Sequence, residues 1–437
     1  MTIAMTPTYW SIVILVAGAV ILLMLVSSLS PHPRGVAYAG VPFAVVAAGF
    51  GLSAPQPIAL AIVALCIACV VALLLIPVLE PAVPAHVAEA TALLLLGTAG
   101  AIGLAQATDL LQVVVGLETL ALSAVTLVAL GVGDRSLEAA FKYIVLGAIS
   151  LAALLYGLGL VYLGNGSLAF PTASQIESNP LILAGLVLVG LGIVFELALV
   201  PLHWAGLDVY TAAAPGLAGF VMSASKLAAA FALGRVVVAA GLQTTQVLVW
   251  IGCLTIAWGT FGALAQANNL RRMLAYSAVT HAGFIGLALG SGPNGPTTAG
   301  FYAAAYASMA MLVFAGLAGP WAVDLRTIGP LRALAVGLGL LSLAGIPPTP
   351  GFWAKLAVLV VAWQSAGWLP TLIAVAGGVF SALYYLRPIP DLFAALRGTA
   401  EAPEVPRPVL IPGVLVALVT VVVLSLVPGV AWYLVGG

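Results

Sequence analysis

Charged residues are scarce in this sequence. Only 6% of its 437 residues are Asp, Glu, Lys or Arg, whereas 63% are hydrophobic and the mean hydropathy is +1.22. A soluble domain carries about 25% charged residues, so this chain has too few to cover a water-facing surface of ordinary size. The formal net charge is zero and no basic run is present, which excludes a nucleic-acid-binding protein.

Cysteine and catalytic motifs are also lacking. The three cysteines, Cys66, Cys69 and Cys253, fall inside apolar runs, where we interpret them as small hydrophobic residues and not as a redox pair. The sequence has no H-x-x-E-H pattern, Cys/His cluster, phosphate-binding loop or nucleophile elbow. We therefore expect no metal site, no redox cofactor and no bond chemistry in this chain.

What the sequence has instead is a series of apolar runs of about 20 residues, the length with which a helix crosses a bilayer. Proline, glycine and charged residues separate these runs. The pattern predicts an all-α polytopic membrane protein of about fourteen transmembrane helices. The first run has no basic flank and is expected to be a span and not a cleaved signal peptide. We expect spans near residues 9–29, 36–53, 57–79, 87–108, 110–131, 137–163, 181–202, 215–240, 244–266, 273–290, 297–319, 328–345 (continuing as 351–367), 369–388 and 408–435.

Arginine is distributed unevenly among the predicted loops. If the loops alternate sides, only Arg235 approaches one side, and the other arginines lie on or near the opposite side. The positive-inside rule makes the crowded side cytoplasmic. We therefore expect a multi-pass protein of the inner (plasma) membrane with both termini outside the cytoplasm. The arginines of the crowded side are Arg34, Arg135, Arg271, Arg272, Arg326, Arg332, Arg387, Arg397 and Arg407.

Two of the predicted spans contain helix-breaking residues. Pro201 interrupts the seventh span, and the segment Gly345-Ile-Pro-Pro-Thr-Pro-Gly351 interrupts the twelfth. Backbone N–H and C=O groups that a helix break leaves unpaired are tolerated at membrane depth only where protein or a water-filled cavity provides hydrogen-bond partners. Transporters use such breaks near their ion sites, often once in each of two inverted repeats. We therefore favour two inverted five-helix repeats, each with a broken helix, over two ordinary proline kinks.

This interpretation divides the chain into four parts. Three N-terminal transmembrane helices occupy residues 1–85, and the first five-helix repeat occupies residues 86–241. The second five-helix repeat occupies residues 242–390, and residues 391–437 form a loop and the C-terminal transmembrane helix.

The few charged side chains inside the spans are the candidates for function. The chain has only three lysines, Lys142, Lys226 and Lys355, and none lies in a predicted loop. Glu118 and Glu196 lie inside the fifth and seventh spans. A charge at the bilayer centre costs about 2.5–3.5 kcal/mol on insertion scales, so such residues face the bundle interior. Because a buried lysine can hold or release a proton, a row of Lys and Glu predicts a lateral proton relay.

His281 lies in the tenth span beside tyrosine, serine and threonine residues that can carry a proton wire. A structural alternative stays open for each of these groups. Buried charges also form ion pairs that lock helices together, and Glu138 with Lys142, at i and i+4, has the spacing for such a pair. His281 can equally serve to hydrogen-bond neighbouring helices, and His203, after Pro201, is ambiguous in the same way.

Six groups of residues, spread over roughly residues 85–390, carry a resemblance to a known family. The sequence resembles the antiporter-like membrane subunits of respiratory complex I, the proton-translocating NADH–quinone oxidoreductase, and most closely the subunit N family (subunit 2 in mitochondria). The matching stretches are Gly116-Leu-Glu-Thr-Leu120; Arg135-Ser-Leu-Glu-Ala-Ala-Phe-Lys-Tyr143; Val200-Pro-Leu-His203 with Asp208-Val-Tyr210; Ala214-Pro215 with Ser225-Lys226; Asn269-Leu-Arg-Arg-Met-Leu-Ala-Tyr-Ser277 with Thr280-His-Ala-Gly283; and Gly345-Ile-Pro-Pro-Thr-Pro-Gly-Phe-Trp-Ala-Lys355.

The resemblance implies the same fold as the proline and arginine patterns, together with a function. The chain would translocate protons in the lipid bilayer, coupled to quinone reduction in other membrane and peripheral subunits of a complex I-type assembly. NAD, FMN, iron–sulfur clusters and quinone would be held by those partners and not by this chain. The resemblance implies relay roles for Glu118, Lys142, Lys226 and Lys355. Together with the buried Glu196 and His281, the residues predicted to form the proton relay are Glu118, Lys142, Glu196, Lys226, His281 and Lys355.

One residue departs from the family pattern. The family normally has lysine in the seventh helix, where this chain has Glu196. Two nearby carboxylates in a low dielectric do not both ionise readily, so we expect Glu118 and Glu196 to form a coupled pair that shares a proton or uses Lys142 as its counter-charge.

Two other functions stay open: a subunit of a multi-subunit cation/proton antiporter, and a non-pumping structural subunit.

Overall fold

The computed structural model describes residues 7–26, 33–78, 86–131, 133–241, 245–319, 324–398 and 408–426. Within these ranges the chain is helical apart from turns, short connections and an isolated β-bridge between Asp109 and Ala169. Nine of the described helices are long and apolar enough to cross a membrane, and four shorter apolar helices accompany them. The predicted class, an all-α polytopic membrane protein, is confirmed.

The observed helices follow the predicted spans in order and position. Three short helices, α8, α10 and α18, were not among the predicted spans. The predicted span ends at residues 27–29, 79, 244 and 427–435, and Arg407, lie outside the described residues. The helices are α1 (Pro7–Ile21), η1 (Leu22–Val26), α3 (Pro33–Gly51), α4 (Ile58–Leu75), η2 (Ile76–Val78), α5 (Val87–Ala105), α6 (Leu110–Ala129), α7 (Asp134–Asn165), α8 (Ala173–Ser178), α9 (Pro180–Leu197), α10 (Trp204–Ala212), α11 (Pro215–Ala239), α12 (Gln246–Ala265), α13 (Leu270–Leu289), α14 (Gly295–Gly316), α15 (Pro330–Ala344), α16 (Pro350–Ser365), α17 (Trp368–Leu386), α18 (Ile389–Leu396), η3 (Pro408–Leu410) and α19 (Ile411–Leu426).

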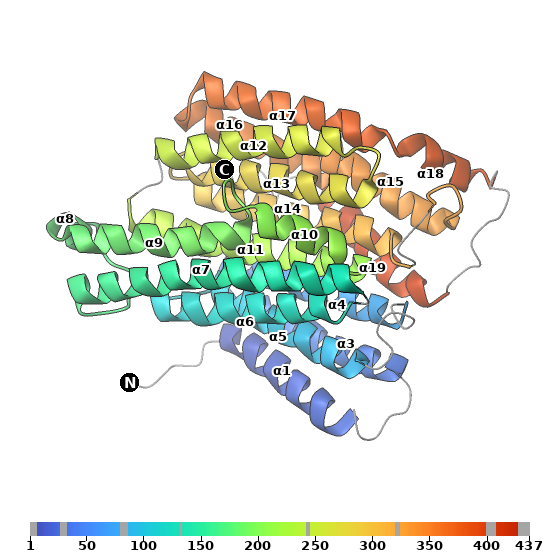
Figure 1. Cartoon of the computed structure of the whole chain (residues 1–437), viewed down its shortest axis with the longest axis horizontal. Helices are drawn as coiled ribbons and strands as arrows, with labels where there is room; N and C mark the ends of the chain where they lie inside the picture. The colour runs from blue at the N-terminus through green and yellow to red at the C-terminus, as the bar shows by residue number, and fades with distance from the viewer. Residues whose placement is uncertain are drawn as a thin grey trace.

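The long helices lie side by side, with α1 at one edge of the bundle and α17 at the opposite edge (Figure 1), while α14 and α19 pack against α4 near the centre. The spanning window of α14 is 100% buried and that of α11 is 83% buried, against 17% for α7 and 33% for α17. The core of the molecule is therefore centred on α11 and α14, which pack against each other. The outer faces of α7 and α17 are left for lipid or for neighbouring subunits.

Small residues let the helices approach closely where the site is built. A Cβ atom on Gly116 of α6 would lie 2.5 Å from the backbone nitrogen of Leu104 in α5. A Cβ atom on Gly100 of α5 would lie 2.7 Å from the backbone nitrogen of Leu120 in α6. Membrane helices gain van der Waals contact through such small-residue interfaces. This interface fixes the position of Glu118, which lies two residues after Gly116.

Both predicted interruptions are present. The first separates α9 from α10, and Ala198, at the end of α9, adopts a left-handed conformation with φ of 62°. The second separates α15 from α16, and Gly345 adopts φ of 86° there. Glycine accepts this conformation without the Cβ clash that Ala198 bears. At each break the first half-helix ends at a buried residue, Leu197 or Ala344, whereas the segment that follows reaches the surface, where Trp204 is 55% and Ile346 37% exposed.

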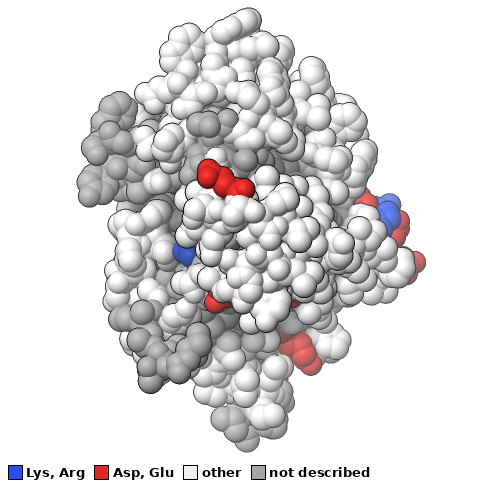
Figure 2. Space-filling model, turned by 90° about the vertical axis from the view of Figure 1, so that its left-hand side faces the viewer, with Lys and Arg blue, Asp and Glu red and all other residues white. Residues whose placement is uncertain are grey.

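The two ends of the bundle differ in positive charge. Helix α7 runs from Asp134 at one end to the connection that carries α8 at the other (Figure 1). Figure 2 views the molecule from the α8 end, and its surface shows very little blue. Arg135, Arg271 and Arg272 line one pocket at the opposite end. These three arginines therefore lie together, as the loop pattern predicted.

Candidate functional site

Five of the six predicted relay residues form a row through the bundle. Glu196, Lys226, His281 and Lys355 are buried, and Glu118 is half-buried. Each neighbouring pair in the row interacts electrostatically. In order across the bundle the row consists of Glu118 on α6, Glu196 on α9, Lys226 on α11, His281 on α13 and Lys355 on α16.

Glu196 accepts hydrogen bonds from two other helices. The hydroxyl of Tyr143 on α7 donates to Oε2 at 2.8 Å, and the hydroxyl of Ser225 on α11 donates to Oε1. A buried carboxyl group needs such partners because desolvation is otherwise costly. The nearby charge that acts on Glu196 is that of Lys226. The expectation that Lys142 provides the counter-charge is therefore not met.

Glu118 and Glu196 are neighbours in the row, and the predicted coupling of their protonation stays a prediction. Their carboxyl groups interact with each other, and Tyr143 interacts electrostatically with both. Glu118 makes no side-chain hydrogen bond within the described part of the chain. Glu118 is half-buried, whereas Glu196 is buried and bonded to two hydroxyl groups.

Lys226 is fully buried at the centre of α11. Its ammonium donates to the Tyr210 hydroxyl at 3.1 Å and lies 4.8 Å from the centre of that ring. It also lies 6.0 Å from the ring of Tyr306 on α14. Aromatic faces attract a cation through their quadrupole. Because Tyr210 belongs to α10, the half-helix after the first break, the break places an aromatic hydroxyl beside the central lysine.

His281 joins three helices. One ring nitrogen, Nδ1, lies 2.7 Å from the hydroxyl of Tyr302 on α14, and Nε2 lies 3.1 Å from the hydroxyl of Tyr385 on α17. The hydroxyl groups of Ser277 and Thr280, beside it in sequence, donate to carbonyl groups of their own helix, and Ser277 also interacts with the Tyr385 side chain. Tyrosines of distant helices hold the ring, and a proton wire through its sequence neighbours stays a prediction.

Lys355 closes the row at the second break. Its ammonium donates to the carbonyl oxygens of Leu343 and Ala344 at 2.9 and 2.8 Å and to the Ser381 hydroxyl at 3.1 Å. These carbonyls end α15, where the helix dipole is negative and the last carbonyls lack helical partners. A Cβ atom on Gly345 would lie 2.9 Å from Cδ of this lysine. The broken helix therefore supplies both the acceptors for the lysine and the space for its side chain.

Tyrosine is the residue type that sequence reasoning missed. The tyrosines around the row are almost completely buried, although each carries a polar hydroxyl. The available signal was tyrosine inside apolar runs, since a buried tyrosine hydroxyl usually finds a partner. The sequence does not say which partner. The tyrosines in contact with the row are Tyr143, Tyr210, Tyr302, Tyr306 and Tyr385.

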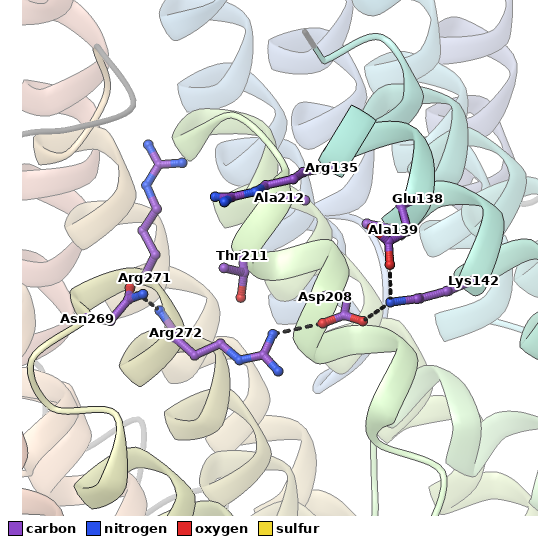
Figure 3. Close-up of a pocket in the computed structure, with 10 residues that line it drawn as sticks. All are labelled: Arg135, Glu138, Ala139, Lys142, Asp208, Thr211, Ala212, Asn269, Arg271 and Arg272. Carbon is purple, nitrogen blue, oxygen red and sulfur yellow. Dashed lines mark hydrogen bonds and ion pairs between the residues drawn. The ribbon is translucent and has the colours of Figure 1, made fainter. Parts of the chain in front are cut away.

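Lys142 lies apart from the row, near the start of α7. Its ammonium pairs with Glu138 at 2.6 Å and with Asp208 at 3.2 Å, and 46% of its side chain is exposed. Asp208 is also paired with Arg272 at 2.8 Å (Figure 3). The predicted pair between Glu138 and Lys142 is therefore present. These residues line a cavity of about 600 Å³, which we call the α7–α13 pocket: Arg135, Glu138, Ala139, Lys142, Asp208, Thr211, Ala212, Asn269, Arg271 and Arg272.

His203 belongs to an aromatic cluster outside the row. Its ring centre lies 4.6 Å from that of Trp204 and 5.8 Å from that of Trp258.

Across the residues that the structure describes, no three His, Cys, Asp or Glu side chains come together as metal ligands. The arrangement of the row is suited to holding and passing protons.

Comparison with known proteins gives one consistent family. Residues 107–381 match the family described as NADH:quinone oxidoreductase/Mrp antiporter, TM. The NADH-quinone oxidoreductase subunit N of Deinococcus radiodurans is 35% identical over 367 residues, which cover 79% of this chain and 74% of that protein.

Solved structures share the fold over nearly the whole chain. A chain of respiratory complex I from Thermus thermophilus with bound aureothin superposes with a TM-score of 0.80 at 32% identity, covering 98% of this chain and 100% of that one. A chain of the membrane-bound sulfane sulfur reductase, an archaeal respiratory membrane complex, superposes with a TM-score of 0.86 at 23% identity, covering 98% and 96%. The second likeness concerns the fold alone.

Proposed function

This chain belongs to the NADH:quinone oxidoreductase/Mrp antiporter membrane family, within its subunit N group, and on that basis we propose that it is the proton-translocating subunit N-like component of a complex I-type NADH–quinone oxidoreductase. The observation that carries the proposal is the row from Glu118 to Lys355. It joins acidic, basic and imidazole groups through the interior of a membrane bundle, at the two helix breaks.

The row works as an electrostatic chain. Glu196 faces Lys226, and Lys226 and Lys355 both act on His281. A proton that arrives on one group changes the field at the next, so protonation states along the row are coupled. Tyrosine hydroxyls can accept one proton as they donate another, and the row has them beside the carboxyl, lysine and histidine groups. The chain therefore needs no redox group of its own to move protons.

Lys142 is assigned to the entrance of this pathway. It lies in the α7–α13 pocket, which opens to the surface, and it precedes Tyr143, whose hydroxyl bonds Glu196. An exposed ammonium at the end of a bundle exchanges protons with water. The six predicted residues then divide into an entrance, Lys142, and a buried row of five.

The two breaks support the finer architecture that the sequence predicts. We assign fourteen transmembrane helices on the family resemblance, with inverted repeats in residues 86–241 and 242–390, three helices in residues 1–85, and a loop and final helix in residues 391–437. Each repeat then contains one broken helix, α9 with α10 and α15 with α16. The arginine-rich end faces the cytoplasm, and both termini lie outside.

Partners follow from the kind of assembly. The related Thermus chain is part of a respiratory complex. We therefore expect this chain to pack against other membrane and peripheral subunits, and NAD, FMN, iron–sulfur clusters and quinone to be bound by those subunits. The exposed apolar faces of α7 and α17 are available for lipid and for membrane subunits.

The test is to purify the assembly through a tag on this chain and reconstitute it in proteoliposomes. We expect flavin and iron–sulfur subunits to co-purify, and NADH oxidation by added quinone to acidify or alkalinise the vesicle lumen in a protonophore-sensitive way. The second candidate is a subunit of a cation/proton antiporter, which the matched family also includes. That function predicts no flavin subunits and a cation/proton exchange driven by an imposed pH gradient without NADH.

A further inference from the structure

The α7–α13 pocket carries more positive than negative charge. Its lining includes four cationic side chains and two carboxylates. Lys142 contacts both carboxylates, Glu138 and Asp208, and Arg272 contacts Asp208. Arg135 forms no ion pair with any residue in the described ranges. The lining therefore has two positive charges in excess.

The excess charge lies on one side of the pocket. Figure 3 shows the guanidinium groups of Arg135 and Arg271 on the side away from the ion pairs of Asp208. These arginines belong to the first turns of α7 and α13, where helix dipoles add positive potential. Planar guanidinium groups bind phosphate oxygens through paired hydrogen bonds. The pocket is therefore suited to a phosphate ester.

An apolar surface adjoins this polar pocket. On α7, Leu137, Phe141 and Ile144 alternate with the pocket-lining residues and are 56%, 68% and 49% exposed. The spanning window of α7 is only 17% buried. A ligand with a phosphate headgroup and long apolar chains would thus find a surface for each part, at the end of a spanning helix.

We propose that the α7–α13 pocket binds the phosphodiester headgroup of an anionic phospholipid. The phosphate lies against Arg135 and Arg271, headgroup hydroxyls donate to Glu138 or Asp208, and the acyl chains cover the apolar face of α7. Basic pockets between membrane helices at the cytoplasmic side bind anionic headgroups. A cavity of about 600 Å³ accepts a headgroup.

The test measures lipid retention by the full-length chain, purified together with the subunits that stay bound to it. After delipidation in detergent, the sample is titrated with phosphatidylglycerol or phosphatidylcholine, and bound lipid is counted by native mass spectrometry. We expect phosphatidylglycerol to bind preferentially and Arg135→Gln to weaken its binding about tenfold. The matched control is Arg326→Gln, which removes the same charge from an exposed pair with Asp391 outside the pocket.

Several results would overturn the proposal. Equal retention of both lipids, or an equal loss of bound phosphatidylglycerol in Arg135→Gln and Arg326→Gln, would show that the pocket is not a headgroup site. Displacement of phosphatidylglycerol by inorganic phosphate supports a phosphate site and the lipid assignment together. Binding of inorganic phosphate without any preference between the lipids would assign the pocket to free phosphate. Loss of a bound subunit with Arg135→Gln, at unchanged lipid retention, would assign the pocket to a protein partner.

Discussion

Lys226 is fully buried, yet its ammonium makes no ion pair within 4 Å of a described carboxylate. Its direct partner is a tyrosine hydroxyl, and the partners of Glu196, His281 and Lys355 are likewise hydroxyl and carbonyl groups. A close buried ion pair would hold both charges strongly. Hydroxyl groups satisfy either protonation state because they donate and accept. At the scale of single residues, the partners of these four side chains therefore permit a change of protonation state.

Glu196→Gln tests the importance of the carboxyl charge. Glutamine keeps the shape and still accepts a hydrogen bond from Tyr143 or Ser225, but it cannot hold a proton for transfer. We expect normal assembly with proton transport reduced about tenfold or more, measured as protons moved per quinone reduced. Glu177→Gln, in the exposed helix α8, is the control and is expected to transport normally. Equal transport by both variants would remove Glu196 from the row.

Tyr143→Phe tests how the same carboxyl is held. Loss of the 2.8 Å hydrogen bond leaves a buried acceptor with one partner fewer, which costs about 1–3 kcal/mol. We expect a lower melting temperature of the protein in detergent. Tyr156→Phe on the same helix is the control, since that side chain is 66% exposed. If the two variants melt at the same temperature, the bond to Glu196 contributes nothing to stability.

The sequence identifies the charged members of the row but not their partners. Lys226 and Glu196 are conspicuous because charge is rare in an apolar chain. Tyr143 lies 53 residues from Glu196, and Tyr385 lies 104 residues from His281. Such pairs depend on which helices pack together, and that information is not in the local pattern. For the same reason, Lys142 was considered as a counter-charge for the two glutamates, whereas its ammonium pairs with Asp208, which follows the first break.

At the scale of elements, the second helix break, between α15 and α16, has the best-defined contacts. Lys355 supplies donors to the last carbonyls of α15, and the left-handed Gly345 makes room for it. Proline and glycine density predicted this break, since neither residue supports a continuous helix. The identity of the capping group was not predictable, because a lysine beyond a break can point in several directions.

Gly345→Ala tests this break. Alanine at φ of 86° is strained, and its Cβ would lie 2.9 Å from Cδ of Lys355. We expect destabilisation by about 1–2 kcal/mol, measured as a lower melting temperature, with reduced proton transport. Gly159→Ala is the control, because Gly159 lies inside α7 and a Cβ there meets open space. That change is expected to stabilise by about 0.5–1 kcal/mol. A lower melting temperature for Gly345→Ala and a higher one for Gly159→Ala would support this role of Gly345. Equal shifts of the melting temperature in the two variants would contradict it.

At the scale of the whole molecule, the charge difference between the two ends predicts the orientation. Glu177 in α8 lies at the charge-poor end, and Asp391 in α18 lies at the other (Figure 1). We introduce Glu177→Cys and Asp391→Cys separately and treat intact spheroplasts with a membrane-impermeant thiol reagent. Only Glu177→Cys is expected to react before permeabilisation. The described cysteines are buried and give a low background. Reaction of Asp391→Cys alone would reverse the orientation.

The overall architecture was predictable because bilayer thickness and proline placement constrain it strongly. The apolar runs gave the order of the spans, and Pro201 and Gly345 marked the two breaks. Short helices such as α8 and α18 were missed, since six and eight residues are too few to give a spanning pattern. The inverted relation between the two repeats stays a prediction.

The central claim is that Lys226 passes protons and does not merely hold helices together. The most direct measurement is the number of protons translocated per quinone reduced by reconstituted Lys226→Ala, compared with Ser223→Ala, a buried residue of the same helix that bonds the Ala307 carbonyl. We predict that both variants assemble and that only Lys226→Ala loses coupled proton transport. A Lys226→Ala complex that assembles and translocates protons at the normal ratio would contradict the account, and so would one whose sole defect is poor assembly.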